Sequence, residues 1–576
     1  MNKKRWNIAP LAPEMYIKAM EQNGIHPVLG QVFYGRGYQT PDSALEFLGV
    51  YSHSQDPFLM KGMEQAADRL LSAARNGERI AVYGDFDCDG VTATVLLTEA
   101  LRRLCGNSEG VKKQITPYIP NRVDEGYGLN SPALRDLADK GYKVVVTVDC
   151  GIRSVQEVID GNACGLDMIV SDHHSVGAEV PPALAVINPK QQGCAYPEKM
   201  LAGVGLAYKI TQALHTKAEE RGFTGLEEWH PEDWLDLVAI GTVADIAPLH
   251  GENRVLVQKG LKKLNTPKRI GLRALYGIAG IRPGNINTVT IGFMIGPRIN
   301  AAGRLKSAYD AARLLTSDNT QQAGQLAQEL ESLNAVRQQK TREMQEWAEE
   351  SMPEVAQMPL LFATDGRFEQ GVVGLVASRL TEQYYRPSAV VQIGEDESHG
   401  SCRSIPEFHI TEALDQCADL LERYGGHAQA AGFTVRNENI EALRDRLIEV
   451  AGQELRGKEL YPALNIDAEL PLRQCTLELA GELAKLEPCG EANPAPVFMT
   501  RNVTLHEVQR VGKDGKHLKL LVGDGGPPIE AIAFRRGEEA DQLSLCADLV
   551  YTLEANEWNG HQRLQLNIQD FRSVEN

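Results

Sequence analysis

Three features that would assign this chain to a familiar class of protein are missing from its sequence. Its ten cysteines are scattered without a Cys-x-x-Cys pair, so we expect neither a disulfide framework nor a structural zinc site. No run of about 18 or more apolar residues occurs, which argues against a membrane-spanning helix. Residues 1–7 are basic but lack the apolar stretch of a signal peptide. These absences predict a cytoplasmic protein.

Basic residues are also scarce relative to acids, and the formal net charge is −18. Phosphate binding depends on clustered Lys and Arg, so this balance argues against a nucleic-acid partner. The distribution of charge matters more than its sum, however, and a site for two divalent cations itself needs several carboxylates. The composition therefore leaves the partner open. A chain of 576 residues is too long for one hydrophobic core, and we expect three or four domains.

Strands alternate with helices in the first half of the chain. Residues 79–83 and 143–148 are apolar runs of the kind that form strands buried on both faces, and residues 167–170 form a third. A helix is expected over residues 91–104, where Leu and Val share one face. This alternation predicts a parallel sheet covered by helices on both sides, so the fold class is α/β.

Three further segments follow this sheet. The Gln-, Ala- and Glu-rich stretch over residues 316–350 predicts a long helical connector. A second α/β unit is predicted after it, with strands near residues 360–363 and 389–392 and a helix over residues 372–384. From about residue 464 onward, short alternating strands separated by turn residues predict a small β-barrel.

Acids and histidines follow the predicted strands at their carboxyl ends, where ligands of parallel sheets gather. A single Asp after a strand is usually a helix cap or a turn residue, but several together repel one another unless a cation lies between them. Oxygen ligands suit Mg²⁺, and an added imidazole favours Mn²⁺ or another transition metal. The sequence therefore predicts a metal site, with a two-metal phosphoryl-transfer mechanism. The segments are Gly84 to Gly90, Val148 to Gly151, Ser171 to His174, and Gly241 to Asp245.

The Asp172-His173-His174 triplet, with Asp-x-Asp before it and Ala244-Asp245 after it, resembles the DHH phosphoesterase superfamily. From about residue 60 to the C-terminus the chain is similar to one of its branches, the bacterial RecJ family of single-stranded-DNA-specific 5′→3′ exonucleases. The segments that carry this similarity are Pro120-Asn121-Arg122, 201–205, 296–304, 370–374, 400–404, 425–427 and 488–496.

The resemblance implies a set of site residues and a division into domains. It implies Mn²⁺ or Mg²⁺ at a two-metal site, with His174 facing the scissile phosphate and Asp172 orienting a histidine. The metal ligands would be Asp85, Asp87, Asp149, His173 and Asp245. Asp89 is expected to cap the helix that starts at Val91. The domains would be an N-terminal segment (1–60), a DHH domain (61–315), a connecting helix (316–355), a DHHA1-type substrate-binding domain (356–460) and an OB-fold domain (461–576).

One departure from the family pattern concerns the metal ligands. Several relatives place a His just before the Asp-x-Asp segment, whereas Ala81, Val82 and Tyr83 stand there in this chain. We expect a water molecule to replace that ligand and the five matched ligands to suffice for activity.

The resemblance also implies which residues hold the nucleic acid. Ser401 and Arg403, two positions apart on a predicted strand, share one face and would read a 5′-terminal phosphate through charge-assisted bonds. The full set of predicted substrate-binding residues is Arg122, Arg298, Asn300, Arg304, Arg379, Ser401, Arg403, Gly426 and His427. In the barrel, Lys513, Lys516, His517 and Lys519 would supply charge, and Phe534, Tyr551 and Trp558 are candidate stacking residues, of which one or two are expected to be core residues.

The function predicted from these observations is that of a metal-dependent exodeoxyribonuclease acting in DNA repair and recombination. It would be a monomer that binds single-stranded DNA and works with single-strand-binding protein and a helicase, partners that the family alone suggests. One alternative is a DHH phosphodiesterase acting on short oligonucleotides or cyclic dinucleotides, against which the barrel argues. Another is a catalytically inactive DHH scaffold, against which the five retained ligands argue.

Overall fold

The computed structural model describes residues 4–50, 55–106, 108–122, 125–126, 128–352, 355–558 and 561–574. The chain divides into two compact units. One comprises His53–Leu460, and the other joins Met1–Ser52 to Tyr461–Asn576. No helix among the described residues is long and apolar enough to cross a membrane.

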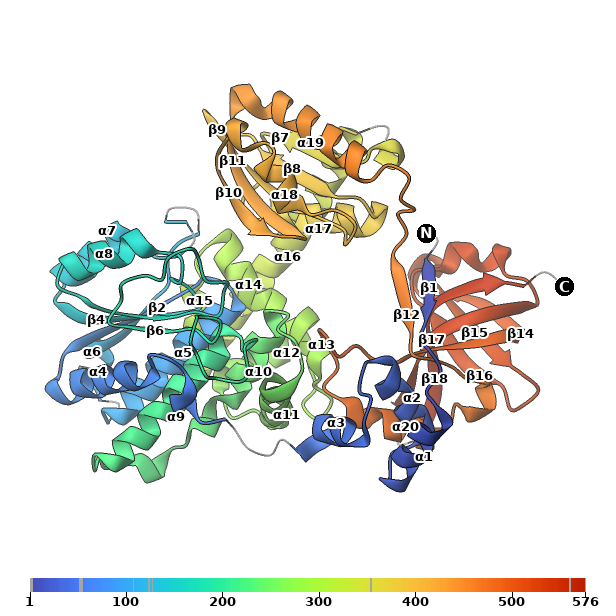
Figure 1. Cartoon of the computed structure of the whole chain (residues 1–576), viewed down its shortest axis with the longest axis horizontal. Helices are drawn as coiled ribbons and strands as arrows, with labels where there is room; N and C mark the ends of the chain where they lie inside the picture. The colour runs from blue at the N-terminus through green and yellow to red at the C-terminus, as the bar shows by residue number, and fades with distance from the viewer. Residues whose placement is uncertain are drawn as a thin grey trace. The chain divides into compact units, whose positions relative to one another are not determined.

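The first domain of the larger unit is built on a fully parallel five-stranded sheet of order β3-β2-β4-β5-β6 (Figure 1). Alternate residues of the central strands face opposite sides, as the period of a strand requires. Val144 and Val146 pack into the core with the helices α4, α5 and α9, whereas Val145 packs with α7 and α8. The predicted parallel sheet covered on both sides is confirmed. The strands are β2 (Arg79–Gly84), β3 (Ile115–Tyr118), β4 (Tyr142–Val148), β5 (Asp167–Ser171) and β6 (Ala185–Ile187), and the helices are α4 (Met63–Asn76), α5 (Cys88–Leu104), α7 (Ser131–Asp139), α8 (Val155–Ala163) and α9 (Gly203–Glu220).

Helices complete this domain and lead out of it. The connector, α16 (Thr320–Glu350), is 31 residues long and capped by the Asn319 side chain, which accepts from Gln322 N. It packs on α12, α14 and α15. The helices before it are α10 (Leu235–Ala244), α11 (Gly251–Leu264), α12 (Ile270–Ala279), α13 (Thr288–Thr290), η5 (Ile291–Ile295), α14 (Gly296–Leu305) and α15 (Tyr309–Thr316).

A second α/β domain follows α16 in the same unit. Its five-stranded sheet has the order β10-β11-β9-β8-β7, and only β7 and β8 pair in parallel. The predicted helix and second strand lie within a residue of α17 and β8, whereas the first predicted strand begins one residue before β7 and ends two residues before it does. The strands are β7 (Leu361–Asp365), β8 (Ser388–Gln392), β9 (Glu397–Arg403), β10 (Leu421–His427) and β11 (Ala430–Arg436), and the helices are α17 (Val373–Tyr384), α18 (Ile410–Asp415) and α19 (Ile440–Glu454).

The smaller unit contains the predicted barrel, which is closed because β14 pairs with both β15 and β17 (Figure 1). The N-terminal residues belong to it: β1 (Arg5–Ile8) pairs in parallel with β12 (Ala463–Ile466), and Trp6 Nε1 donates to Asp570 at 2.8 Å. Apolar residues of α1 (Glu14–Gln22) and α2 (Pro27–Gly35) share the barrel core. The barrel strands are β14 (Val497–Val511), β15 (His517–Gly523), β16 (Ile529–Ala533), β17 (Cys546–Trp558) and β18 (His561–Ser573), with α20 (Leu477–Leu483) before them.

Candidate functional site

The carboxyl ends of the parallel strands bring the predicted ligands together. β2, β4 and β5 end at Gly84, Val148 and Ser171, so the acids and histidines that follow them emerge at one edge of the sheet. Asp245 reaches the same place from the end of α10, where it is the C-cap residue. Three overlapping groups have ligand atoms within 4.8 Å of one another. These groups are Asp85, Asp87 and Asp149; Asp149, His173 and His174; and Asp89, His173 and Asp245.

This cluster fits a divalent cation because it contains buried polar atoms that bind nothing else. Asp85 Oδ1, Asp149 Oδ1 and His173 Nε2 are buried and make no hydrogen bond within the described residues. His173 Nε2 and Asp149 Oδ1 face each other at 3.1 Å. Buried polar atoms without a partner are costly, so the site calls for a bound group. Carboxylate oxygens with one imidazole suit Mn²⁺ or Mg²⁺.

The electrostatics of the cluster lead to the same conclusion. Burial, followed by the charges of Asp89 and Asp87, raises the pKa of Asp245 to about 9. Burial and then the neighbouring acids also raise the pKa of Asp149 well above its usual value. Burial and then the charge of His174 lower the pKa of His173 to about 3, which keeps its imidazole neutral and able to bind a metal. A cation would relieve the repulsion among these carboxylates.

Asp149 is held in an uncommon backbone conformation. Its φ is +64°, in the left-handed region that residues other than glycine rarely adopt. The start of α9 packs tightly against it, since a Cβ atom on Gly203 would lie 2.6 Å from Asp149 Cβ. Strained backbone of this kind persists at functional sites where the surroundings determine it. The strand end and the glycine together fix where the Asp149 carboxylate points.

Asp89 does not cap the helix as predicted. Asp87 is the N-cap, accepting from Asp89 N and Gly90 N at 3.0 Å each, so α5 begins at Cys88. The Asp89 carboxylate instead accepts from Gly203 N and Val204 N, at 2.7 and 2.8 Å, and so caps α9. Its Oδ2 also lies 4.0 Å from His173 Nε2. Asp89 therefore joins two helices beside the candidate metal centre.

Asp172 orients His174. Its Oδ1 lies 2.7 Å from His174 Nδ1 and also accepts from His174 N, while its Oδ2 accepts from Ile152 N at 2.9 Å. Burial lowers the pKa of His174, but the hydrogen bond and charge of Asp172 outweigh it, so the pKa is raised. The imidazole is thus held with Nδ1 toward Asp172.

A group of arginines lies next to the acidic cluster. Arg304, on α14, donates to Gly371 O at 3.0 Å. Burial, then the charges of Arg122 and Arg337, lower its pKa to about 10. Arg122 stacks on Phe86, with its guanidinium carbon 4.1 Å from the ring centroid. Buried Nε atoms of Arg122 and Arg337 have no hydrogen-bond partner in the described parts of the chain. Half-buried cations that repel one another indicate an anion-binding site.

Ser401 and Arg403 lie on β9 as predicted and face the start of α17. Arg403 donates to Cys402 O at 2.8 Å and lies 3.5 Å from Ser401 Oγ. A Cβ atom on Gly374 would lie 3.0 Å from Ser401 Oγ and 3.6 Å from an Arg403 nitrogen. The charge of Arg403 acts on Arg304, so the two groups of residues are adjacent. A helix N-terminus and several guanidinium groups thus surround one small region.

Other predicted residues have different surroundings. Arg298 forms an ion pair with Glu331 and donates to Met294 O at 2.7 Å, so its guanidinium group is already engaged within the protein. Asn300 accepts from Cys88 N at 2.7 Å and thereby holds the loop of the acids. Arg379, on α17, lies close enough for its charge to act on Arg337. At the end of β10, Gly426 is needed for packing, since a Cβ there would lie 2.3 Å from Ala430 O.

Sequence reasoning missed Arg337. It lies on the charged connector α16, where a solvated helix face is the usual interpretation of such residues, and only the fold brings it beside Arg304. Its Nη2 donates to Asn334 Oδ1 at 2.8 Å, and burial, then the charges of Arg379 and Arg298, lower its pKa. Arg337 therefore extends the cationic group from α14 onto the connector.

The barrel aromatics divide between core and surface. Phe534 is 52% exposed and packs edge-on against His517, with ring centroids 5.3 Å apart. Tyr551 is fully buried and bonds to Thr500 Oγ1 at 2.9 Å, so it is a core residue. The side chain of Trp558 lies outside the described residues. Of the predicted basic residues, Lys519 pairs with Glu530 at 3.2 Å.

Comparisons with known proteins agree with this arrangement. Family models match residues 79–242 (DHH family, N-terminal domain), 357–453 (DHHA1 domain) and 466–570 (RecJ OB domain). The single-stranded-DNA-specific exonuclease RecJ of Bacillus subtilis is 37% identical, over 99% of this chain and 71% of its own length. That of Escherichia coli is 35% identical, over 94% and 95%. The crystal structure of Thermus thermophilus RecJ with Mn²⁺ superposes with a TM-score of 0.83 at 31% identity, over 99% of this chain and 80% of that one.

Proposed function

This chain belongs to the RecJ family of DHH phosphoesterases, and from that premise we propose that it hydrolyses single-stranded DNA from the 5′ end. It would do so with two divalent cations, in DNA repair and recombination. The observation that carries the proposal is the meeting of two features in one unit: a buried acidic cluster with partnerless ligand atoms, and a buried arginine group beside it.

Two of the ligand groups that the fold assembles would each hold one ion. Asp85, Asp87 and Asp149, which form one of these groups, would hold the first. His173 would hold the second together with Asp149 and Asp245, whose oxygens lie 3.1 and 3.7 Å from its Nε2, so Asp149 would be shared. When bound, such cations supply the positive charge that activates water and stabilises a phosphoryl group. His174, oriented by Asp172, would donate from Nε2 to the scissile phosphate and stabilise charge that develops on it.

The arginine group would select the 5′ end. A terminal phosphate carries more negative charge than an internal one, and charge-assisted hydrogen bonds are about twice as strong as neutral ones. Ser401, Arg403 and the N-terminus of α17 would bind this phosphate, with Arg304 and Arg122 completing the pocket between it and the acids. Because these half-buried groups would be matched to the extra charge of a terminal phosphate, they would favour an end over a continuing strand.

The experiment is digestion of a 3′-labelled single strand, a blunt duplex and a dinucleotide, each with and without Mn²⁺. We expect Mn²⁺-dependent shortening of the single strand from its 5′ end, with the duplex resistant. Release of the 3′ label as a mononucleotide before shorter labelled strands appear would refute the polarity. Activity on dinucleotides without activity on longer strands would favour the short-substrate alternative, and no hydrolysis of any of them would favour the inactive scaffold.

A further inference from the structure

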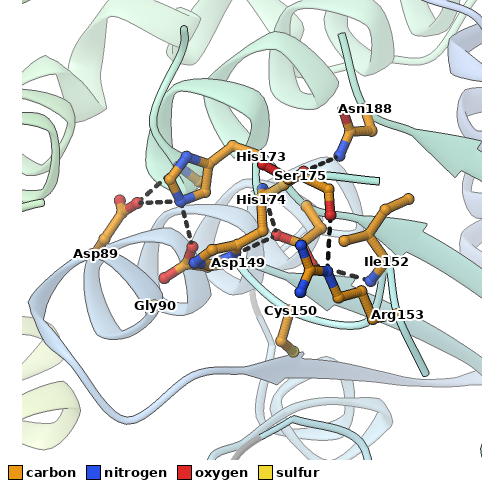
Figure 2. Close-up of polar contacts among 12 residues, drawn as sticks. Asp89, Gly90, Asp149, Cys150, Ile152, Arg153, His173, His174, Ser175 and Asn188 are labelled. Atoms are coloured by element: carbon orange, nitrogen blue, oxygen red, sulfur yellow. Dashed lines mark hydrogen bonds and ion pairs between the residues drawn. The ribbon is translucent and has the colours of Figure 1, made fainter. Parts of the chain in front are cut away.

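The loop after β5 is held by side chains that the proposed function does not use. The backbone carbonyls of three successive residues in this loop each accept a hydrogen bond from a side chain elsewhere in the domain, and Figure 2 shows two of these contacts. Two of the three donors are cations. Lys190 Nζ donates to His173 O at 2.6 Å, Asn188 Nδ2 to His174 O at 2.9 Å, and Arg153 Nε to Ser175 O at 3.0 Å.

The two cations have hydrogen-bonding capacity left over. An ammonium group has three N–H donors and a guanidinium five, and each group uses one of them in these contacts. Within the described residues, neither Arg153 nor Lys190 forms an ion pair with a carboxylate, although Asp172 and Asp245 are close enough for their charges to act on Lys190. Cations placed without a carboxylate partner beside a phosphoryl-transfer site suit a phosphate.

A third donor comes from the second α/β domain. His427 lies at the end of β10, and partial burial, then the charges of Arg153, His174 and Lys190, lower its pKa. His427 therefore lies near Arg153, His174 and Lys190. None of them is among the residues whose charges act on Arg304.

Both cationic groups lie near the candidate metal centre. Burial and Asp87 raise the pKa of Asp85, and the charges of Arg122 and of His174 oppose that rise. Arg122 belongs to the group around Arg304, whereas His174 belongs to the group around His427. A strand with its first phosphate beside Arg403 and its next phosphate at the metals would bring the following phosphate to the second group.

We propose that Arg153 and Lys190 form a second phosphate subsite, which holds the phosphodiester immediately 3′ of the bond being cleaved. The inference rests on the proposed function, because the pocket at Arg403 determines which side of that bond faces these cations. The subsite would favour strands that continue beyond the scissile bond, and so it gives a reason for longer substrates to be cleaved faster than dinucleotides.

The test uses the full chain with Mn²⁺ and two 5′-phosphorylated thymidine trinucleotides. They differ only in the second internucleotide linkage, which is a phosphodiester in one and an uncharged methylphosphonate in the other. Release of the first nucleotide should be slower by about tenfold or more on the methylphosphonate, because one bond to a charged group is lost. R153Q and K190Q keep an N–H donor for the loop carbonyls, and each should slow cleavage of the all-phosphate strand and reduce the tenfold ratio toward one.

R135Q is the matched control, since Arg135 is exposed on α7 and should leave both rates and their ratio unchanged. A purely structural role in holding the loop would slow both trinucleotides equally, so variants that retain the parent's ratio would overturn the proposal. So would a parent that cleaves both strands at one rate, an outcome that needs no variant to fold. If the parent did not hydrolyse the all-phosphate strand at all, the proposed function itself would fail.

Discussion

Replacing Arg403 by alanine should remove the preference for a 5′-phosphorylated end. Arg403 is half-buried, and within the described residues its hydrogen bonds, to Cys402 O and Ser401 Oγ, both come from Nη1, so Nε and Nη2 are available to a terminal phosphate. A hydrogen bond to a charged group contributes about 1.5–3 kcal/mol, and every 1.4 kcal/mol is about a tenfold change. Because Arg304 and Ser401 remain, we expect the rate ratio of 5′-phosphate to 5′-hydroxyl strands to fall about tenfold to a hundredfold rather than further.

The assay compares initial rates on two strands of one sequence that differ only in the 5′ phosphate. Arg403→Ala should slow cleavage of the phosphorylated strand and hardly change cleavage of the other. The dependence of its activity on Mn²⁺ should match the parent's, because the acids are untouched. Arg456→Ala, an exposed position in the same domain, is the control and should behave as the parent does. A variant that keeps the parent's ratio would show that Arg403 does not read the end.

Three further predictions concern the metal ligands and the barrel. Asp149→Ala should abolish cleavage, while single-strand binding, measured by fluorescence anisotropy, survives. Activity within about tenfold of the parent at saturating Mn²⁺ would refute the shared-ligand role, because a tenfold change in rate is only about 1.4 kcal/mol of activation free energy. Without metal, the fold should lose stability as pH rises from the ordinary Asp value of 3.8 toward 9, because the raised pKa of Asp245 means that the folded state binds its proton more tightly. Thermal melts over a range of pH, in a chelator and in Mn²⁺, test this. Melting temperatures that change with pH in the same way in both conditions would contradict it. Phe33→Ala should lower the unfolding free energy of the barrel unit by about 3–5 kcal/mol, because Phe33 is fully buried in the barrel core, and leave hydrolysis of trinucleotides intact. Denaturant unfolding followed by tryptophan fluorescence measures it, and an unchanged midpoint would place α2 outside the barrel core.

The strand-end acids could be predicted because the information is local. Apolar runs identify β2, β4 and β5, and in a parallel sheet every residue that follows such a run emerges at the same edge. The motif segments then specify which acids and histidines matter. What brings Asp245 to them is a helix end, which the apolar run before it also indicates.

The remaining contacts join residues that are far apart in the sequence. Asp89 bonds to the start of α9, 114 residues away. Its position in the sequence lies beside the start of α5, so the sequence favoured a cap on α5 instead. Trp6 bonds to Asp570 across 564 residues, and no pattern in the first 60 residues links them to the barrel. Arg337 is one of several charged residues on a long helix, and only tertiary packing distinguishes it from the solvated ones.

The truncation that separates the barrel from the catalytic domains has to follow these contacts. Removing residues 464–576 alone would leave the apolar residues of α1 and α2, among them Met20, Leu29 and Phe33, without the core that buries them. Exposed apolar surface of that kind favours aggregation, and a loss of activity would then say nothing about the barrel. Residues 53–460 form the unit to test. Since the acids, Arg403 and Arg153 all lie within it, we expect this fragment to hydrolyse trinucleotides at the rate of the full chain and to bind long strands more weakly. A fragment that melts cooperatively but cleaves no trinucleotide would show that the barrel unit takes part in catalysis.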